Sequence, residues 1–182
     1  MNPQTPESRR RARAAYTRAL NIAKKARLDA LAIDTIHMFA FVDTAPADQL
    51  NRGLEALALV ETSDQPEAKS WEASVRSNIG EALYELGRYD EAMTHFRTAL
   101  ALRENGTNQN AIRDAHWQIA RVLRNLGRTD EALAIQLRLE SESAATGDPK
   151  YYIFEELELL YRDKGSMDRA NHYVKLVKSF AK

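Results

Sequence analysis

The segment Leu86–Leu100 reads "LGRYDEAMTHFRTAL", and forty residues later Leu126–Glu140 reads "LGRTDEALAIQLRLE". Apolar residues three and four apart before and after the "GR" break predict two helices joined by a tight turn. Gly87 is expected to end the first helix in the left-handed conformation, which a residue without Cβ adopts most easily. The acidic pair Asp90–Glu91 is expected to begin the second helix, because the helix dipole favours negative charge there. The doubled segment therefore predicts a repeated helical hairpin.

Weaker copies of the same segment lie on both sides. One copy runs from Leu157 through Gly165 to Val174, and a degenerate one runs upstream from Ile36 to the "ALAL" of Ala56–Leu59. If Thr44, Gly87, Gly127 and Gly165 are equivalent, the spacings are 43, 40 and 38 residues. A single hairpin cannot bury its apolar face, whereas stacked hairpins bury a continuous core. We therefore expect Gly80 and the alanines of each copy to lie where helices approach closely.

These copies resemble the tetratricopeptide repeat family, whose pattern W-x2-L-G-x2-Y followed by A-x3-F has a period of about 34 residues. The best copy reads Arg76-x2-Ile79-Gly80-x2-Leu83, then Ala92-x3-Phe96. It departs from the pattern because Arg76 stands at the Trp position. The other copies replace the Gly with His37, Ala120 and Glu158. The longer period resembles kinesin-light-chain-like variants, and the resemblance covers roughly residues 30–182.

The resemblance implies an all-α fold, a right-handed α-solenoid of four tetratricopeptide-like helical hairpins preceded by a capping helix. We expect one domain over residues 1–182. The capping helix is expected at 7–27, and the hairpins at 29–61, 67–104, 109–145 and 149–181. Within the second hairpin the first helix is expected at 67–86, and within the first hairpin at 29–43.

Charge is distributed unevenly along a chain whose formal net charge is zero. Residues 1–28 hold eight basic residues and one acid, whereas residues 29–72 hold nine acids and two basic residues. We expect the basic first helix to lie against the acidic segment that follows it. The chain has no cysteine, which excludes disulfides and thiolate sites and fits a reducing, cytoplasmic location. No apolar run reaches the length of about 18 residues expected of a membrane span.

The sequence contains none of the known catalytic or metal-binding motifs that we searched for. The four histidines, His37, His95, His116 and His172, show no zinc-binding spacing. No Gly-rich phosphate loop and no nucleophile motif is present. We therefore expect no enzyme, no metal and no cofactor.

The family resemblance implies a partner-binding concave face, lined by the first helix of each hairpin. Aromatic residues mixed with arginines are typical of binding surfaces. The residues expected on this face are Met38, Phe41, Tyr84, Trp117, Arg121, Arg124, Tyr152 and Arg162. For Trp117 and Tyr152 the alternative is that they pack between repeats, because a register error of one residue exchanges the faces.

The expected partner is another protein or a peptide segment, held by an adaptor, scaffold or chaperone-like module. The alternative is a regulatory module that contacts nucleic acid or an acidic surface through the basic N-terminal helix. Nucleic acid is the less favoured partner because the chain as a whole lacks a basic excess. The sequence does not specify the oligomeric state.

Overall fold

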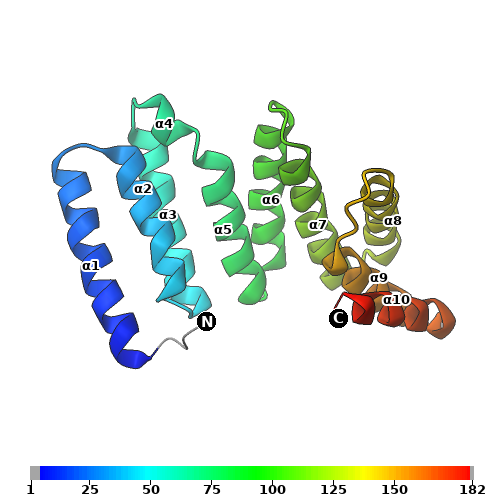
Figure 1. Cartoon of the computed structure of the whole chain (residues 1–182). Helices are drawn as coiled ribbons and strands as arrows, with labels where there is room; N and C mark the ends of the chain where they lie inside the picture. Colours follow the sequence, from blue (N-terminus) through cyan, green and yellow to red (C-terminus); the bar gives the residue numbers. More distant parts are fainter. Residues whose placement is uncertain (1–4, 181–182) are drawn as a thin grey trace. The chain divides into compact units, whose positions relative to one another are not determined.

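The computed structural model describes residues 5–180, which form helices and connecting turns without any strand (Figure 1). The expected all-α class built of helical hairpins is therefore confirmed. Contacts within the chain divide it into two units, which meet at Asn105 and Gly106 and are described separately below. The single domain over residues 1–182 stays a prediction, and the expected end of the last hairpin at residue 181 lies outside the described residues.

Unit 1 contains six α-helices and one short 3-10 helix within the described residues. They are α1 Pro6–Lys25, α2 Asp29–Met38, η1 Phe39–Phe41, α3 Pro46–Thr62, α4 Pro66–Lys69, α5 Glu72–Glu85 and α6 Tyr89–Glu104. Neighbours in sequence pack side by side: α1 on α2, α2 on α3, α3 on α5, and α5 on α6. Helices α1, α3 and α4 each have a proline in the first turn, where its missing N–H leaves no hydrogen bond unmade.

Tight turns connect the helices of each hairpin, as the "GR" break predicts. Gly87 has a φ of 72°, its N–H donates to the Tyr84 carbonyl, and the Arg88 N–H donates to the Leu83 carbonyl. The same two hydrogen bonds recur at Gly127 and Gly165 in unit 2. They also recur between α1 and α2, where the left-handed residue is Arg27 with a φ of 54°. The sequence did not predict this turn, because arginine gives no signal for a positive φ.

Gly80 lies where α5 and α6 nearly touch, as expected. A Cβ atom at Gly80 would lie 2.6 Å from Cε1 of Phe96, which is itself almost fully buried. A second close approach was not predicted. A Cβ atom at Gly53 of α3 would lie 2.6 Å from Cγ1 of Ile79 on α5. Glycine therefore sets the packing distance on both sides of α5.

Two expected helices are shorter than predicted. The helix expected at 67–86 is divided into α4 and α5 by a bend at Ser70 and Trp71. The bend turns Lys69 back so that its ammonium donates to the carbonyls of Val60 and Glu61, which lie near the C-terminus of α3. The helix expected at 29–43 is α-helical only to Met38 and continues as the 3-10 turn η1, before Pro46 begins α3.

The basic first helix lies against the acidic segment, as predicted from the charge split. Its buried face places Leu20 and Ala23 in the core, and the Tyr16 ring packs edge-on against Phe39 at 5.6 Å. Arg13 pairs with Asp43 at 2.5 Å, and Lys24 pairs with Glu55 at 2.7 Å. Thus α1 caps unit 1 through both apolar and ionic contacts.

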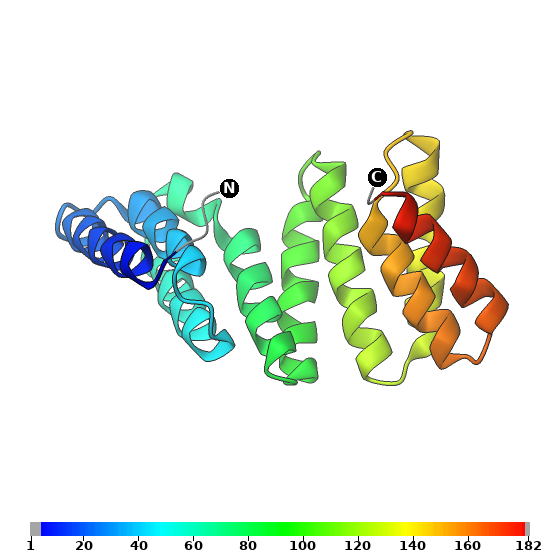
Figure 2. The same cartoon turned by 60° about the horizontal axis from the view of Figure 1, so that its bottom comes forward.

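Unit 2 consists of two hairpins: α7 Gln109–Asn125 with α8 Thr129–Ala145, and α9 Tyr151–Asp163 with α10 Met167–Ser179. Helices α9 and α10 run side by side (Figure 2). Helices α8, α9 and α10 share a core whose aromatic residues are Phe154, Tyr161 and Tyr173 and whose aliphatic residues include Leu139, Ile153 and Leu157. Of the helices in the described part of the chain, none is both long and apolar enough to cross a membrane.

Candidate binding surfaces

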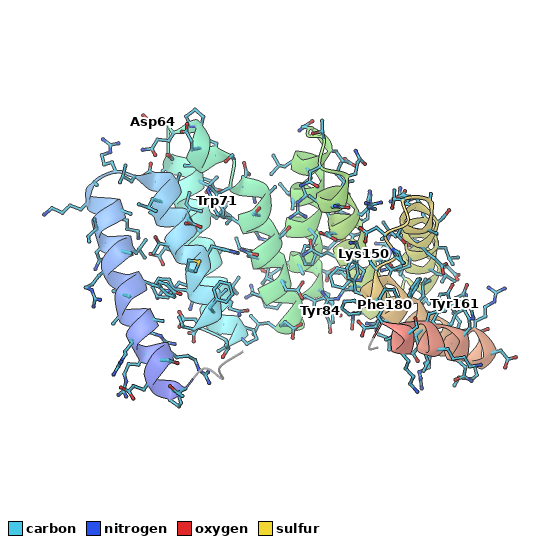
Figure 3. The ribbon with its side chains drawn as sticks, viewed as in Figure 1. Asp64, Trp71, Tyr84, Lys150, Tyr161 and Phe180 are labelled. Carbon is cyan, nitrogen blue, oxygen red and sulfur yellow. The ribbon has the colours of Figure 1, made fainter. Side chains whose placement is uncertain are left out.

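In unit 1 the sequence predicted three partner-binding residues. Phe41, in η1, is 54% exposed, so about half of its side chain is accessible to a partner. Met38 is partly exposed at the end of α2. Tyr84, near the end of α5, is partly buried, and its ring lies 5.5 Å from that of Tyr89 (Figure 3). Phe41 is therefore the most accessible of the three.

A cleft that the sequence did not predict lies between α2, α3 and α5, and we refer to it as the unit 1 cleft. Its volume is about 130 Å³. Its apolar wall is formed by Ile33, Ile36, Ala40, Gly53, Ala56 and Val75, and Trp71 stands at the start of α5 beside it. The close approach that Gly53 permits between α3 and α5 shapes this wall.

Polar side chains also line the unit 1 cleft. His37 Nδ1 and the Asn78 amide nitrogen lie 3.1 Å apart and join α2 to α5, and the His37 ring lies 6.0 Å from Trp71. Asp43, on the other side, is buried and contacts both Arg13 and Arg52. Gln49 has no hydrogen bond from its side chain within residues 5–180. The cleft thus combines an apolar wall with one carboxylate that two arginines pair and with one amide that is open to a ligand.

The ionic group continues beyond the cleft. Arg52 also pairs with Glu55 at 2.9 Å, and its guanidinium lies 4.0 Å from the centre of the Phe39 ring. Burial alone would raise the pKa of Glu55, but hydrogen bonds from Lys24 and Arg52 outweigh it and lower this pKa below its ordinary value. The network Arg13–Asp43–Arg52–Glu55–Lys24 therefore joins α1, the segment after η1 and α3, and both of its carboxylates are paired.

In unit 2, Trp117 and Tyr152 pack against each other, which is the alternative left open by the sequence. Their ring centres lie 5.0 Å apart, and the Trp117 indole N–H donates to the Tyr152 carbonyl. The Arg121 guanidinium lies 4.6 Å from the centre of the Trp117 ring. Burial, followed by a hydrogen bond of 2.8 Å to Asp114, raises the pKa of the Tyr152 phenol above its usual range. Both rings remain partly exposed, so a packing role and a binding role share the same residues.

The two other arginines predicted in unit 2 have partners within the unit. Arg124 on α7 pairs with Glu156 on α9 at 2.6 Å, and the Glu156 side chain is only 6% exposed. This ion pair therefore joins two hairpins. Arg162 pairs with Glu158 one turn earlier on α9 and remains mostly exposed, so a partner can still reach it.

Sequence reasoning missed two exposed aromatic residues of unit 2. Tyr151 is 51% exposed and Phe180 is 45% exposed, and their rings lie 6.5 Å apart where α9 begins and α10 ends. The only signal for them was their place next to the helix boundaries, which the repeat pattern assigns to turns rather than to a surface.

The structure adds no indication of catalysis. Among the described residues, no group of three or more histidine, aspartate and glutamate side chains is arranged to hold a metal ion. Burial lowers the pKa of His95, and the nearby Arg76 acts in the same direction. Glu91 acts in the opposite direction without outweighing them, and a half-buried histidine whose pKa is lowered in this way is typical of packing.

Comparison with known proteins identifies the repeat. Residues 71–139 match the family model described as tetratricopeptide repeat. The crystal structure of MamA resembles the chain with a TM-score of 0.61 at 18% identity, covering 97% of this chain and 95% of that one. A kinesin light chain of Podosopora anserina with nearly identical TPR-like repeats gives a TM-score of 0.54 at 15% identity, covering 97% and 96%. At these identities the likeness concerns the fold. No curated protein sequence matches the chain.

Proposed function

Because this chain carries tetratricopeptide repeats, we propose that it is a non-catalytic adaptor, scaffold or chaperone-like module that binds a segment of another protein. The family match over residues 71–139 carries the proposal, since repeats of this kind present extended faces for protein partners. We assign binding to the faces of the first helices of the hairpins, within each unit.

The side chains proposed to contact the partner differ in how far they already interact with other residues of the protein. In unit 1, Met38, Phe41 and Tyr84 would present apolar surface beside the unit 1 cleft. In unit 2, Trp117 and Tyr152 would offer the exposed edges of their packed rings, while Arg121 and Arg162 would attract carboxylates of the partner. Arginine suits this role because its planar guanidinium matches a carboxylate. Arg124 is the weakest of the original assignments because Glu156 already engages it.

The proposal is tested with a partner isolated by affinity purification from the native source. Phe41→Ala removes an exposed side chain, so the protein should fold normally. If Phe41 is an anchor, affinity should fall by about thirtyfold, as truncation of an anchor costs about 2 kcal/mol. Arg162→Glu should slow association most at low salt, because it reverses the local charge. If both variants bind the partner as tightly as the wild type, the proposed faces are wrong.

One observation favours a second candidate, contact with nucleic acid or another acidic surface through α1. Arg10, Arg18 and Lys25 are exposed and have no ion pair within the described part of the chain, whereas Arg13 and Lys24 are paired with Asp43 and Glu55. A binding constant for duplex DNA that falls steeply with salt, and that Arg18→Glu weakens, would support this candidate. Binding that is absent at low salt would exclude it.

A further inference from the structure

The unit 1 cleft has the size of one side chain. Pockets that hold cofactors or drug-sized ligands measure roughly 300–1,000 Å³. A cavity of about 150 Å³ holds a single benzene ring. At about 130 Å³ the cleft therefore fits a leucine, methionine or phenylalanine side chain rather than a metabolite.

The lining favours an uncharged group. Ile36, Ala56 and Val75 supply apolar wall, and Trp71 adds an aromatic face at the mouth. Of the charged residues in the lining, Asp43 and Arg52 pair with each other and with Arg13 and Glu55, and Glu81 also has an interaction of its own. A charged occupant would lose its hydration without gaining a free counter-ion, which disfavours it.

The surroundings of the cleft favour basic residues next to that group. Residues 29–85, which include the elements around the cleft (α2, η1, α3 and α5), contain eleven acidic and three basic residues. Asp34, which lies on α2 outside the cleft lining, is partly exposed and has no ion pair within residues 5–180. Leu31 on α2 and Phe41 in η1 are half exposed and add apolar surface to the same segment of the chain.

We propose that the unit 1 cleft receives one uncharged apolar side chain of a partner polypeptide whose neighbouring residues are basic. This inference rests on the proposed protein-binding function and names the partner's chemistry. The apolar side chain would lie against Ile36, Val75 and Trp71. The flanking cations would be attracted by Asp34 and by the acidic surface around the cleft.

The test uses blocked tripeptides, so that it does not depend on the native partner. The chain has two tryptophans, Trp71 beside the cleft and Trp117 in unit 2. In NMR spectra of the full chain, the indole N–H signal of Trp71 therefore reports on the cleft, and that of Trp117 is an internal control. Titration with Lys-Phe-Lys should shift the Trp71 signal saturably and leave that of Trp117 in place. Lys-Ala-Lys, which lacks the ring, should bind at least about tenfold more weakly, given the free energy of burying a large apolar side chain. Glu-Phe-Glu should also bind more weakly.

A matched pair of variants locates the binding. Ala40 lies at the cleft and is exposed, so Ala40→Phe should fill the cleft without disturbing the core and abolish the Trp71 shift. Ala58→Phe, on an exposed part of α3 away from the cleft, should leave it unchanged. The proposal is overturned if Lys-Phe-Lys gives no saturable shift, if Lys-Ala-Lys binds equally well, or if Ala40→Phe still binds. In any of these cases partner binding that is still lost in Phe41→Ala would preserve the proposed function, so the two failures are distinguishable.

Discussion

The hairpins α5–α6 and α7–α8 have turns of the same conformation but differ in the side-chain contacts between their helices. In the first, Gly80 faces the buried ring of Phe96. In the second, the equivalent positions hold Ala120 and Gln136, both fully buried. Near the end of the first helix, Tyr84 in α5 corresponds to Arg124 in α7, which forms the ion pair with Glu156. The comparison shows that local backbone chemistry determines the turn, whereas the packing contacts between the two helices differ from one hairpin to the other.

The largest effect is expected at the ion pair of α7. Arg124→Ala would leave the Glu156 carboxylate buried without its partner, which typically costs about 3–5 kcal/mol. A large decrease in the urea midpoint is therefore expected. The double variant Arg124→Met, Glu156→Leu should recover most of the stability, since an apolar pair removes the buried charge. If Arg124→Ala unfolds at the wild-type midpoint, the pair is open in solution and Arg124 is available to a partner after all.

The next effect concerns the close approach in α5–α6. Gly80→Leu would overpack the contact with Phe96 and should cost about 1–3 kcal/mol. Gly80→Ala combined with Phe96→Leu should be less damaging than the sum of the two single changes, because the smaller side chain opposite leaves room for the Cβ atom. Thermal unfolding of the wild type, Gly80→Ala, Phe96→Leu and the double variant measures this coupling. Strictly additive effects would show that the two residues do not meet.

A stabilising change is expected at the corresponding place in α7–α8. Gln136 is fully buried, and neither its amide nitrogen nor its amide oxygen has a hydrogen-bond partner within the described residues. An unsatisfied buried polar group typically costs about 1–3 kcal/mol. Gln136→Leu should therefore raise the stability by about 1–2 kcal/mol, and the reverse change Phe96→Gln in α6 should lower it. An unchanged melting temperature in Gln136→Leu would indicate that bound water satisfies the amide.

The contrast between the two hairpins also explains how far the sequence could predict the structure. Turns and helix spacing depend on local patterns, so Gly87, Gly127 and Gly165 identified the hairpins correctly, and Gly80 identified the close approach. The family resemblance predicted the fold class. Arg27 was missed because its left-handed backbone is imposed by its neighbours rather than by its own type.

The candidate sites were harder to predict because they depend on contacts between distant helices. Arg124 appeared to belong to a binding face until Glu156, 32 residues away, was seen to engage it. The unit 1 cleft requires the bend at Trp71 and the close approach at Gly53, and neither follows from a repeat pattern that is degenerate in this part of the chain. The exposed pair Tyr151 and Phe180 likewise comes from opposite ends of the last hairpin.

The smallest effect is expected at the turns themselves, where Arg27 and Gly87 adopt the same conformation. A non-glycine residue in the left-handed region costs roughly 1 kcal/mol, and at Gly87 no atom lies within 4 Å of the position that a Cβ would occupy. Arg27→Gly should therefore stabilise unit 1 by up to about 1 kcal/mol, reduced by the entropic cost of ordering a glycine, which is more flexible in the unfolded chain. Gly87→Ala should destabilise unit 1 by a similar amount. Chemical denaturation of both variants measures the difference. If Arg27→Gly instead lowers stability, the Arg27 side chain makes a contact that outweighs its backbone strain, in addition to the hydrogen bond that the Gln65 side chain donates to the Arg27 carbonyl.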